Sequence, residues 1–98
     1  MSTIQIRAQV RDDAVAEVEA AATAMFAAID AAAPRGVRYG SAKLADGVTF
    51  LVTLQVDGDD NPLTAIPEFN EFQAGLRGWL AGPPVVEPLT VVGSYQLY

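Results

Sequence analysis

Two arginines in short apolar segments are the residues of this sequence best suited to bind a ligand. Arg7 alternates with apolar side chains near the N-terminus, and Arg38 lies in a second segment of that kind. On one face of a sheet, two guanidinium groups could hold the carboxylate, enolate or phenolate of a small ligand by charge-assisted hydrogen bonds. The simpler alternatives are ion pairs with Glu87 or with carboxylates across a dimer, or exposure at the sheet edge.

Phenols and neutral polar side chains extend this set. A tyrosine such as Tyr39 could donate a hydrogen bond to a phenolate substrate, and in a dry cavity such a bond can support oxygenation without a cofactor. Trp79 shares a helical spacing with Phe69 and Phe72, which is more typical of a core than of a ligand platform. No catalytic residue can be named. The candidates for lining a cavity or binding a substrate are Gln5, Arg7, Gln9, Arg38, Tyr39, Thr53 and Trp79.

An acidic loop resembles a calcium loop only in part. Asp57, Asp59, Asn61 and Glu68 match the spacing of EF-hand ligands. Pro62 stands where that loop needs a glycine for its sharp turn, and the preceding segment has a strand pattern instead of a helical one. We therefore predict a solvated acidic loop and no metal site.

The composition limits the chemistry further. The chain has 98 residues, 51% apolar and 18% charged, which is typical of one globular domain over residues 1–98. It contains no His and no Cys. Thiol nucleophiles, disulfides, Cys/His zinc sites, His-ligated haem and a Ser-His-Asp triad are therefore excluded. We expect no cofactor.

Charge and hydropathy indicate which partners and locations to expect. The formal net charge is −6 and the six basic residues are scattered, so we expect no nucleic-acid binding. The most apolar stretch, residues 20–29, is about half the roughly 20 residues that a membrane span needs. The N-terminus has no export-signal pattern. We expect a cytoplasmic protein without membrane contact, and the alanine-rich composition with a single lysine indicates a bacterial source.

The first part of the chain predicts a strand followed by a helix. Apolar and polar residues alternate from Thr3 to Val10, as in a half-buried strand. Arg11-Asp12-Asp13 then begins a helix that an Asp can cap. Residues 14–33 are rich in alanine, and their larger apolar side chains recur at spacings of three and four along one face. Pro34 ends this helix.

The remainder predicts a hairpin, a second helix and a last strand. Residues 37–44 and 48–56 are strands joined at Asp46-Gly47, a strong hairpin signal. Pro67 suits the first turn of the second helix, which stops before Gly82-Pro83-Pro84. Residues 85–98 are extended and apolar on both faces, with an interruption at Pro88.

This order, β-α-β-β-α-β, predicts an α+β, ferredoxin-like fold: a four-stranded antiparallel sheet with two helices on one face. The other face carries mostly neutral polar and β-branched side chains, and the register decides whether Arg38 or Tyr39 lies there. A solvated face usually carries more charge. We therefore expect a homodimer in which two sheets pack against each other; a partly solvated monomer is the alternative.

The element order, the Pro-Glu-Phe-Asn-Glu-Phe-Gln start of the second helix and the long C-terminal strand after Gly82-Pro83-Pro84 resemble the dimeric α+β barrel superfamily. The antibiotic biosynthesis monooxygenase-like proteins are the members that the sequence resembles most. The resemblance implies two sheets facing each other in a barrel, with the C-terminal strand reaching over to the partner. It also implies a cofactor-independent monooxygenase acting on a small aromatic or polyketide-like substrate in the barrel cavity.

The sequence departs from the haem-degrading members of that superfamily. Those use a histidine as iron ligand with an Asn and a Trp nearby. Trp79 lies roughly where such a Trp would be, but the chain has no His, and the first strand has no Asn. Whether the chain is an enzyme stays open. The main alternative is a non-catalytic dimeric scaffold or a module that binds a small hydrophobic or aromatic ligand, and a regulatory ligand-binding domain is a third.

Overall fold

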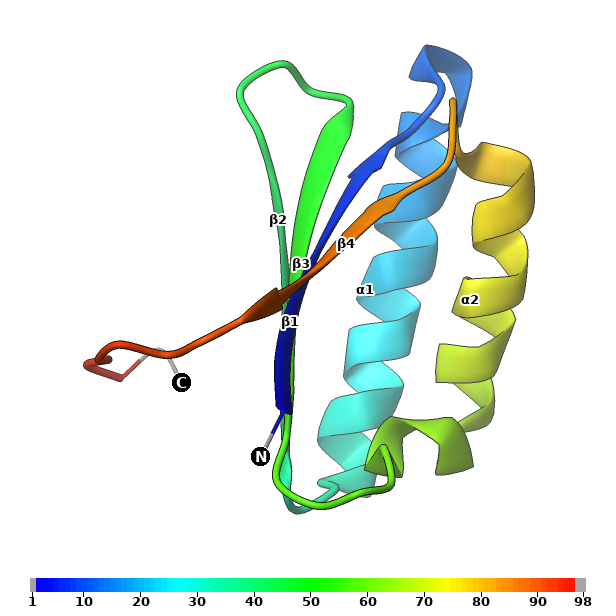
Figure 1. Cartoon of the computed structure of the whole chain (residues 1–98). Helices are drawn as coiled ribbons and strands as arrows, with labels where there is room; N and C mark the ends of the chain where they lie inside the picture. Colours follow the sequence, from blue (N-terminus) through cyan, green and yellow to red (C-terminus); the bar gives the residue numbers. More distant parts are fainter. Residues whose placement is uncertain (1, 97–98) are drawn as a thin grey trace.

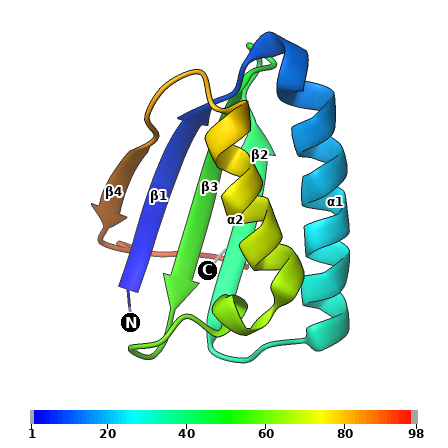
Figure 2. The ribbon, with the colours of Figure 1, turned by 90° about the vertical axis from the view of Figure 1, so that its right-hand side faces the viewer.

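The chain folds into two layers, with both helices on the same side of one sheet (Figures 1 and 2). The computed structural model describes residues 2–96. The strands are all antiparallel and lie in the order β2-β3-β1-β4. The predicted ferredoxin-like α+β fold is therefore confirmed. In chain order the elements are β1 (Ser2–Gln9), a 3₁₀ turn (Asp12–Ala14), α1 (Val15–Ala32), β2 (Val37–Lys43), β3 (Thr49–Val56), a second 3₁₀ turn (Pro62–Ala65), α2 (Pro67–Trp79) and β4 (Val85–Leu89).

Alternation along the strands gives the sheet one apolar face and one mostly polar face. Ile6 of β1 lies opposite Val52 of β3, and both point toward the helices. Arg7 lies opposite Leu51, on the side that no helix covers. We call that side the free face. It comprises Thr3, Gln5, Arg7, Gln9, Arg38, Gly40, Ala42, Thr49, Leu51, Thr53, Gln55, Val85, Glu87 and Leu89.

Helix α1 follows the predicted bounds closely, but its start differs from the expected cap. No side chain caps either the 3₁₀ turn or α1, although Asp12 and Asp13 lie in the first turn as expected. The chain enters through a backbone hydrogen bond from Ala14 N to Arg11 O instead. At the other end Ala33 adopts a left-handed conformation and donates to Ile29 O, immediately before Pro34.

The acidic loop is ordered by its own side chains. Asn61 Oδ1 accepts a hydrogen bond from Leu63 N at 3.0 Å, so this amide caps the second 3₁₀ turn. Pro67 occupies the first turn of α2, as predicted. Among residues 2–96 no group of three or more His, Cys, Asp or Glu side chains is arranged to hold a metal ion. No helix in this same range is both long and apolar enough to cross a bilayer.

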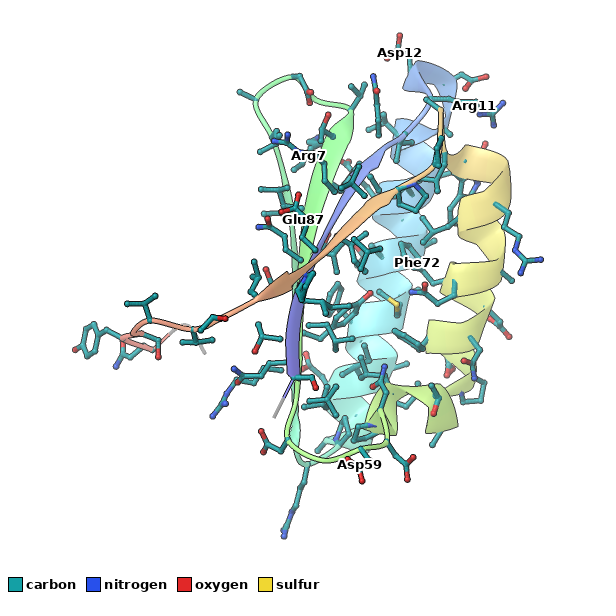
Figure 3. All side chains as sticks on the ribbon, in the orientation of Figure 1. Arg7, Arg11, Asp12, Asp59, Phe72 and Glu87 are labelled. Atoms are coloured by element: carbon teal, nitrogen blue, oxygen red, sulfur yellow. The ribbon has the colours of Figure 1, made fainter. Side chains whose placement is uncertain are left out.

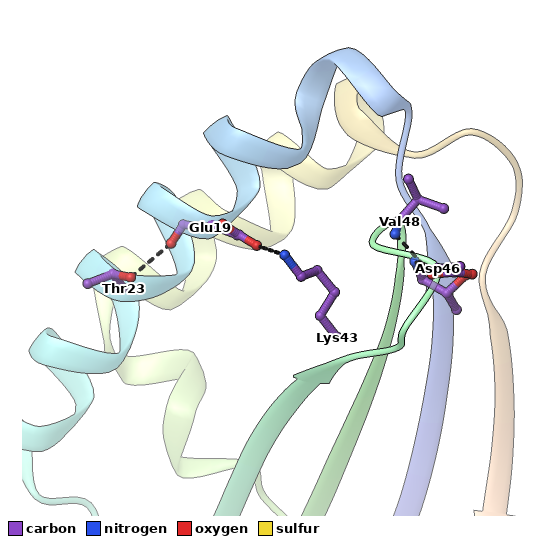
Figure 4. Close-up of polar contacts among 6 residues, drawn as sticks. Glu19, Thr23, Lys43, Asp46 and Val48 are labelled. Atoms are coloured by element: carbon purple, nitrogen blue, oxygen red, sulfur yellow. Dashed lines mark hydrogen bonds and ion pairs between the residues drawn. The ribbon is translucent and has the colours of Figure 1, made fainter.

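Two clusters of buried side chains join the layers. Met25, Leu63, Ile66 and Phe69 pack at one end of the helices, and Val10, Ala14 and Val18 pack at the other. An ion pair between Lys43 of β2 and Glu19 of α1 adds a polar link at the edge of the sheet (Figure 4). Between the two clusters, the side chains of the sheet and the helices leave a cavity.

The last strand is much shorter than predicted. β4 ends at Leu89, which pairs with Thr3, because β1 begins at Ser2 and offers no partner beyond it. Pro88 also lacks the N–H that a further ladder bond would need. Residues 90–96 leave the sheet on the free-face side (Figure 1), where Val92 is 99% and Tyr95 87% exposed. Residues 97 and 98 of the predicted strand lie outside the described residues.

The predicted hairpin turn is held by one carboxylate. Asp46 accepts hydrogen bonds from Val48 N at 3.0 Å, Thr49 N at 2.9 Å and Thr49 Oγ1 at 2.6 Å (Figure 4). Gly47 supplies the positive φ, 79°, that the turn requires. The Thr49 hydroxyl, then the two backbone N–H groups, and more weakly the charge of Arg7 hold the pKa of Asp46 below its usual value.

Replacing Asp46 by Ala is expected to lower the free energy of unfolding at neutral pH. A carboxyl whose folded-state pKa is depressed stabilises the fold above its unfolded pKa, and this contribution disappears as the pH falls through the folded value. The difference from wild type should therefore shrink well below pH 3.8, the ordinary value for Asp. Urea unfolding at neutral pH and at a pH well below 3.8 measures this difference in the free energy of unfolding. Asp12→Ala serves as an exposed control. A pH-independent difference would contradict this assignment.

Candidate functional site

The free face carries a shallow hollow that contains several of the predicted site residues. Its volume is about 480 Å³. Arg38 Nη1 donates to Gln55 Oε1 at 2.7 Å, and Gln55 Nε2 donates to Thr3 Oγ1 at 3.1 Å. The guanidinium is thus held by a neutral amide. The residues that line the hollow are Gln5, Arg38, Tyr39, Gly40, Ser41, Ala42, Leu51, Thr53 and Gln55.

The other two predicted polar residues lie in a different hollow. Arg7 and Gln9 border a space of about 330 Å³ together with Asp46 and Thr49. Arg7 and Glu87 extend from the same side of the sheet (Figure 3), but within residues 2–96 neither Arg7 nor Arg38 forms an ion pair. Arg7 and Arg38 therefore line separate hollows and do not share one binding site. Their expected joint role remains a hypothesis that this arrangement does not favour.

The side chains of Tyr39 and Arg38 lie on opposite faces of the sheet. The register places Tyr39 opposite Leu54, on the helix side, and Arg38 opposite Gln55, on the free face. The Tyr39 ring stacks on Phe26 at 5.3 Å and meets the edge of Phe69 at 5.7 Å between ring centroids. The sequence left open whether Arg38 or Tyr39 lies on the free face, and the register places Arg38 there, because adjacent strand residues point to opposite faces.

Trp79 is also remote from the free face. Its ring tilts against Phe72 with centroids 5.8 Å apart, and its Nε1 donates to Glu17 of α1 at 3.1 Å. It folds back over Gly75, where a Cβ would lie only 2.6 Å from its ring. Trp79 therefore bridges the two helices and packs against Phe72, as the helical spacing of the aromatic residues predicted.

Replacing Gly75 by Val is expected to displace the Trp79 indole and break its bond to Glu17. The added side chain would overlap ring atoms that already lie at 2.6–3.1 Å from the position of a Cβ. The emission of Trp79, the sole tryptophan, should therefore shift toward that of an exposed indole. Gly78→Val serves as the matched control, since nothing lies within 4 Å of its Cβ position. Identical spectra for both variants would contradict this account.

A further cavity lies between the sheet and the helices. Its volume is about 250 Å³, and no charged residue lines it. Small side chains leave part of the space, because Ala8 of β1 and Ala22 of α1 are among the residues that line it. Phe72 lies between the sheet and α2 (Figure 3). The lining residues are Ile6, Ala8, Val10, Val18, Ala22, Met25, Phe26, Tyr39, Ser41, Phe50, Val52, Phe72, Gln73, Leu76, Leu80, Pro84 and Val86.

The polar groups of this interior cavity come from two elements. Tyr39 and Ser41 belong to β2, and Gln73 belongs to α2. Burial raises the pKa of the Tyr39 phenol, while its hydrogen bond with Gln73 acts in the opposite direction. At neutral pH the phenol is therefore protonated and can donate a hydrogen bond. An apolar cavity with a few convergent polar groups is the usual form of a site for a small ligand.

Sequence reasoning missed this site because it expected the cavity between two facing sheets. Only Tyr39 of the predicted set lines it. Two signals could have located it: Ala8 and Ala22 are small residues at core-facing positions, and Gln73 follows Phe72 near the middle of the second helix. Small residues at core-facing positions indicate space between the layers that a ligand could fill.

The fold of this chain matches solved structures, whereas comparison of its sequence with protein families finds no match. No family model matches the chain, and no curated protein is similar to it. The chain has the ferredoxin-like α+β fold of antibiotic biosynthesis monooxygenase-like structures.

Three solved structures illustrate this likeness. Rv0793 from Mycobacterium tuberculosis has a TM-score of 0.73 and 21% identity, over 95% of this chain and 96% of that one. A candidate antibiotic biosynthesis monooxygenase from Nitrosomonas europaea has a TM-score of 0.78 and 14% identity, over 95% and 100%. SnoaB, a cofactor-independent oxygenase from Streptomyces nogalater, has a TM-score of 0.69 and 19% identity, over 97% and 96%.

Proposed function

We propose that this chain is a cofactor-independent monooxygenase that binds a small aromatic or polyketide-like substrate in the interior cavity. The observation that carries the proposal is the apolar cavity with Tyr39 and Gln73 at its polar end. The likeness to SnoaB supports the choice of reaction class. The cavity is smaller than the roughly 300 Å³ at which drug-sized ligand pockets begin, so the substrate is expected to have two or three fused rings.

Such a reaction needs no external reductant. In the oxidation of anthrone to anthraquinone by dioxygen, one oxygen atom forms the new C=O and the other leaves as water. The two hydrogens of that water come from the substrate methylene, whose two C–H bonds break. The substrate supplies all four electrons that reduce dioxygen, so atoms and electrons balance without a metal or flavin.

The role proposed for this chain is to hold the substrate oxygen and exclude water. Tyr39 donates a hydrogen bond to the oxygen on which negative charge develops, and the apolar walls make that bond stronger than it would be in water. The ring of Tyr39 is fixed by Phe26 and Phe69, so the donor is positioned before the substrate arrives. His is not required, because Tyr39 acts as a donor and not as a base.

Dioxygen uptake with anthrone as substrate tests the proposal. The wild-type protein should consume one dioxygen per anthraquinone formed, above the rate in buffer. Tyr39→Phe should slow turnover by about tenfold or more, the loss of one donor to a developing charge. Arg77→Ala, an exposed change on α2, should leave the rate unchanged. Uptake no faster than in buffer would refute catalysis on this substrate class.

A non-catalytic ligand-binding module or scaffold is the second candidate. It is favoured by one observation: no residue that lines the cavity can act as a general base near neutral pH. The substrate would then have to lose its proton to solvent. Stoichiometric binding of anthrone without dioxygen uptake would establish the binding module, and the absence of both would leave the scaffold.

We also propose that two copies pair through their free faces. That face is poor in charged side chains for a protein of net charge −6, and it exposes Leu51 and Val85 in part. Residues 90–96 project from the same side without contacts that bury Val92 or Tyr95. A second sheet packed there would cover both features.

Replacing Leu51 by Arg is expected to convert the dimer into a monomer. The two new guanidinium groups would be buried in the sheet-to-sheet contact without partners, which is strongly unfavourable. Native mass spectrometry of wild type and variant measures the effect. Ala74→Arg, on the exposed side of α2, should remain dimeric. A wild-type protein that is monomeric would refute the dimer.

We further propose a bacterial, cytoplasmic protein. The similar solved structures come from bacteria. A chain without Cys needs no oxidising compartment to fold. Fractionation of a bacterial strain that expresses the native gene would test the location.

A further inference from the structure

We infer that the interior cavity selects an uncharged ring compound with one oxygen, which Tyr39 and Gln73 hold together, and that it rejects carboxylates. This inference rests on the proposed function, since it requires the cavity to be a ligand site. It goes beyond that function because it assigns the selectivity to two named side chains. It also excludes a class of ligands that the arginines of the sequence would have favoured.

The residues that line the cavity include no basic side chain. Lys43 pairs with Glu19 outside the cavity, and Arg7 and Arg38 extend from the free face. A carboxylate in the cavity would therefore lose water without meeting a cation, which is costly for any buried charge. The net charge of −6 adds a repulsion at longer range.

Tyr39 and Gln73 give the cavity one polar end. Stacking on Phe26 and the edge contact with Phe69 fix the direction of the Tyr39 hydroxyl. The Gln73 amide beside it can both donate and accept. A ligand hydroxyl or carbonyl can therefore be held at this end by both side chains. Of the polar lining residues, Ser41 and Gln73 are exposed and Tyr39 is half-buried. The remaining lining residues are apolar, so a second polar group placed deeper in the cavity would find no partner.

Isothermal titration with naphthol, naphthalene and naphthoate tests this selectivity on one ring system. The wild-type protein should bind naphthol about three- to tenfold more tightly than naphthalene, the gain of one neutral hydrogen bond. Naphthoate should bind at least about 100-fold more weakly than naphthol. Equal affinity for naphthol and naphthalene would overturn the role of the polar pair, and tighter binding of naphthoate would overturn the charge argument. Both results would leave the proposed ligand site intact.

Two variants assign the effect to the named residues. Tyr39→Phe and Gln73→Met should each reduce the preference for naphthol over naphthalene, while the affinity for naphthalene stays within about twofold of wild type. Glu71→Gln, at an exposed position of α2 outside the cavity lining, should change neither value. A preference that survives both cavity variants would overturn the assignment. Failure of all three compounds to bind would refute the ligand site as well as its selectivity.

Discussion

Replacing Val52 by Phe should abolish ligand binding and leave the protein folded. Val52 lies on β3, faces the helices and lines the interior cavity opposite α1. A benzyl group at this position would extend into a space of about 250 Å³ that the ligand must occupy. An aromatic residue is well tolerated in a strand, and here it would enter a void instead of a filled core. The expected loss of naphthol affinity is about 100-fold or more.

The matched control for this prediction is Val52→Ile. It adds one methyl group at the same position and should weaken naphthol binding by no more than about tenfold. Urea unfolding of Val52→Phe should show stability equal to or above that of wild type, because filling a cavity restores contacts across it. Unchanged naphthol affinity in a folded Val52→Phe protein would mean that the ligand binds elsewhere.

Replacing Leu63 by Ala should give the largest loss of stability among single substitutions in this chain. Leu63 is 0% exposed and packs with Met25, Ile66 and Phe69 where the second 3₁₀ turn meets α1. Truncating a fully buried leucine costs about 2–5 kcal/mol, through lost transfer energy and the remaining cavity. For a domain of this size, that corresponds to a decrease in Tm of roughly 10–30 °C.

Thermal and urea unfolding measure this effect. Leu63→Met conserves volume and should cost less than about 1.5 kcal/mol. Leu44→Ala, at a half-buried position in the hairpin loop, should cost less than Leu63→Ala. If both alanine variants had the same midpoint, Leu63 would not have the central place in the core that its burial gives it.

The fold was predictable because local signals agreed with the long-range pattern. The alternation from Thr3 to Val10, the alanine-rich helix before Pro34 and the turn at Asp46-Gly47 each specify one element. Their order then leaves few ways to bury the apolar faces. The end of β4 was not predictable in the same way. An apolar run continues past Leu89, but a strand ends where its neighbour ends, and β1 begins at Ser2.

The candidate site was harder to predict, because it depends on the volume left between the sheet and the helices and not on the type of any one residue. Arg7 and Arg38 were predicted as site residues because they are charged, but in the structure they line two separate shallow hollows. The interior cavity forms where Ala8 and Ala22 leave the layers unfilled, and no pattern in the sequence states how far apart the layers lie. Tyr39 was a candidate, but its face depended on a one-residue register choice that only the structure resolves.

The two faces of the sheet therefore have different proposed roles. In this proposal the helix side would hold an uncharged ligand among apolar walls, and the free face would pair with a second copy. Shape and one polar end would then replace charge as the means of recognition.

Nuclear Overhauser effects between bound naphthol and the protein test the central claim most directly. The interior cavity predicts contacts from the naphthol ring protons to the methyl groups of Met25, Val52 and Leu76. Contacts to Ala42, Leu51 and Thr53 instead would place the ligand in the hollow of the free face. That result would contradict both the proposed site and the role of Tyr39.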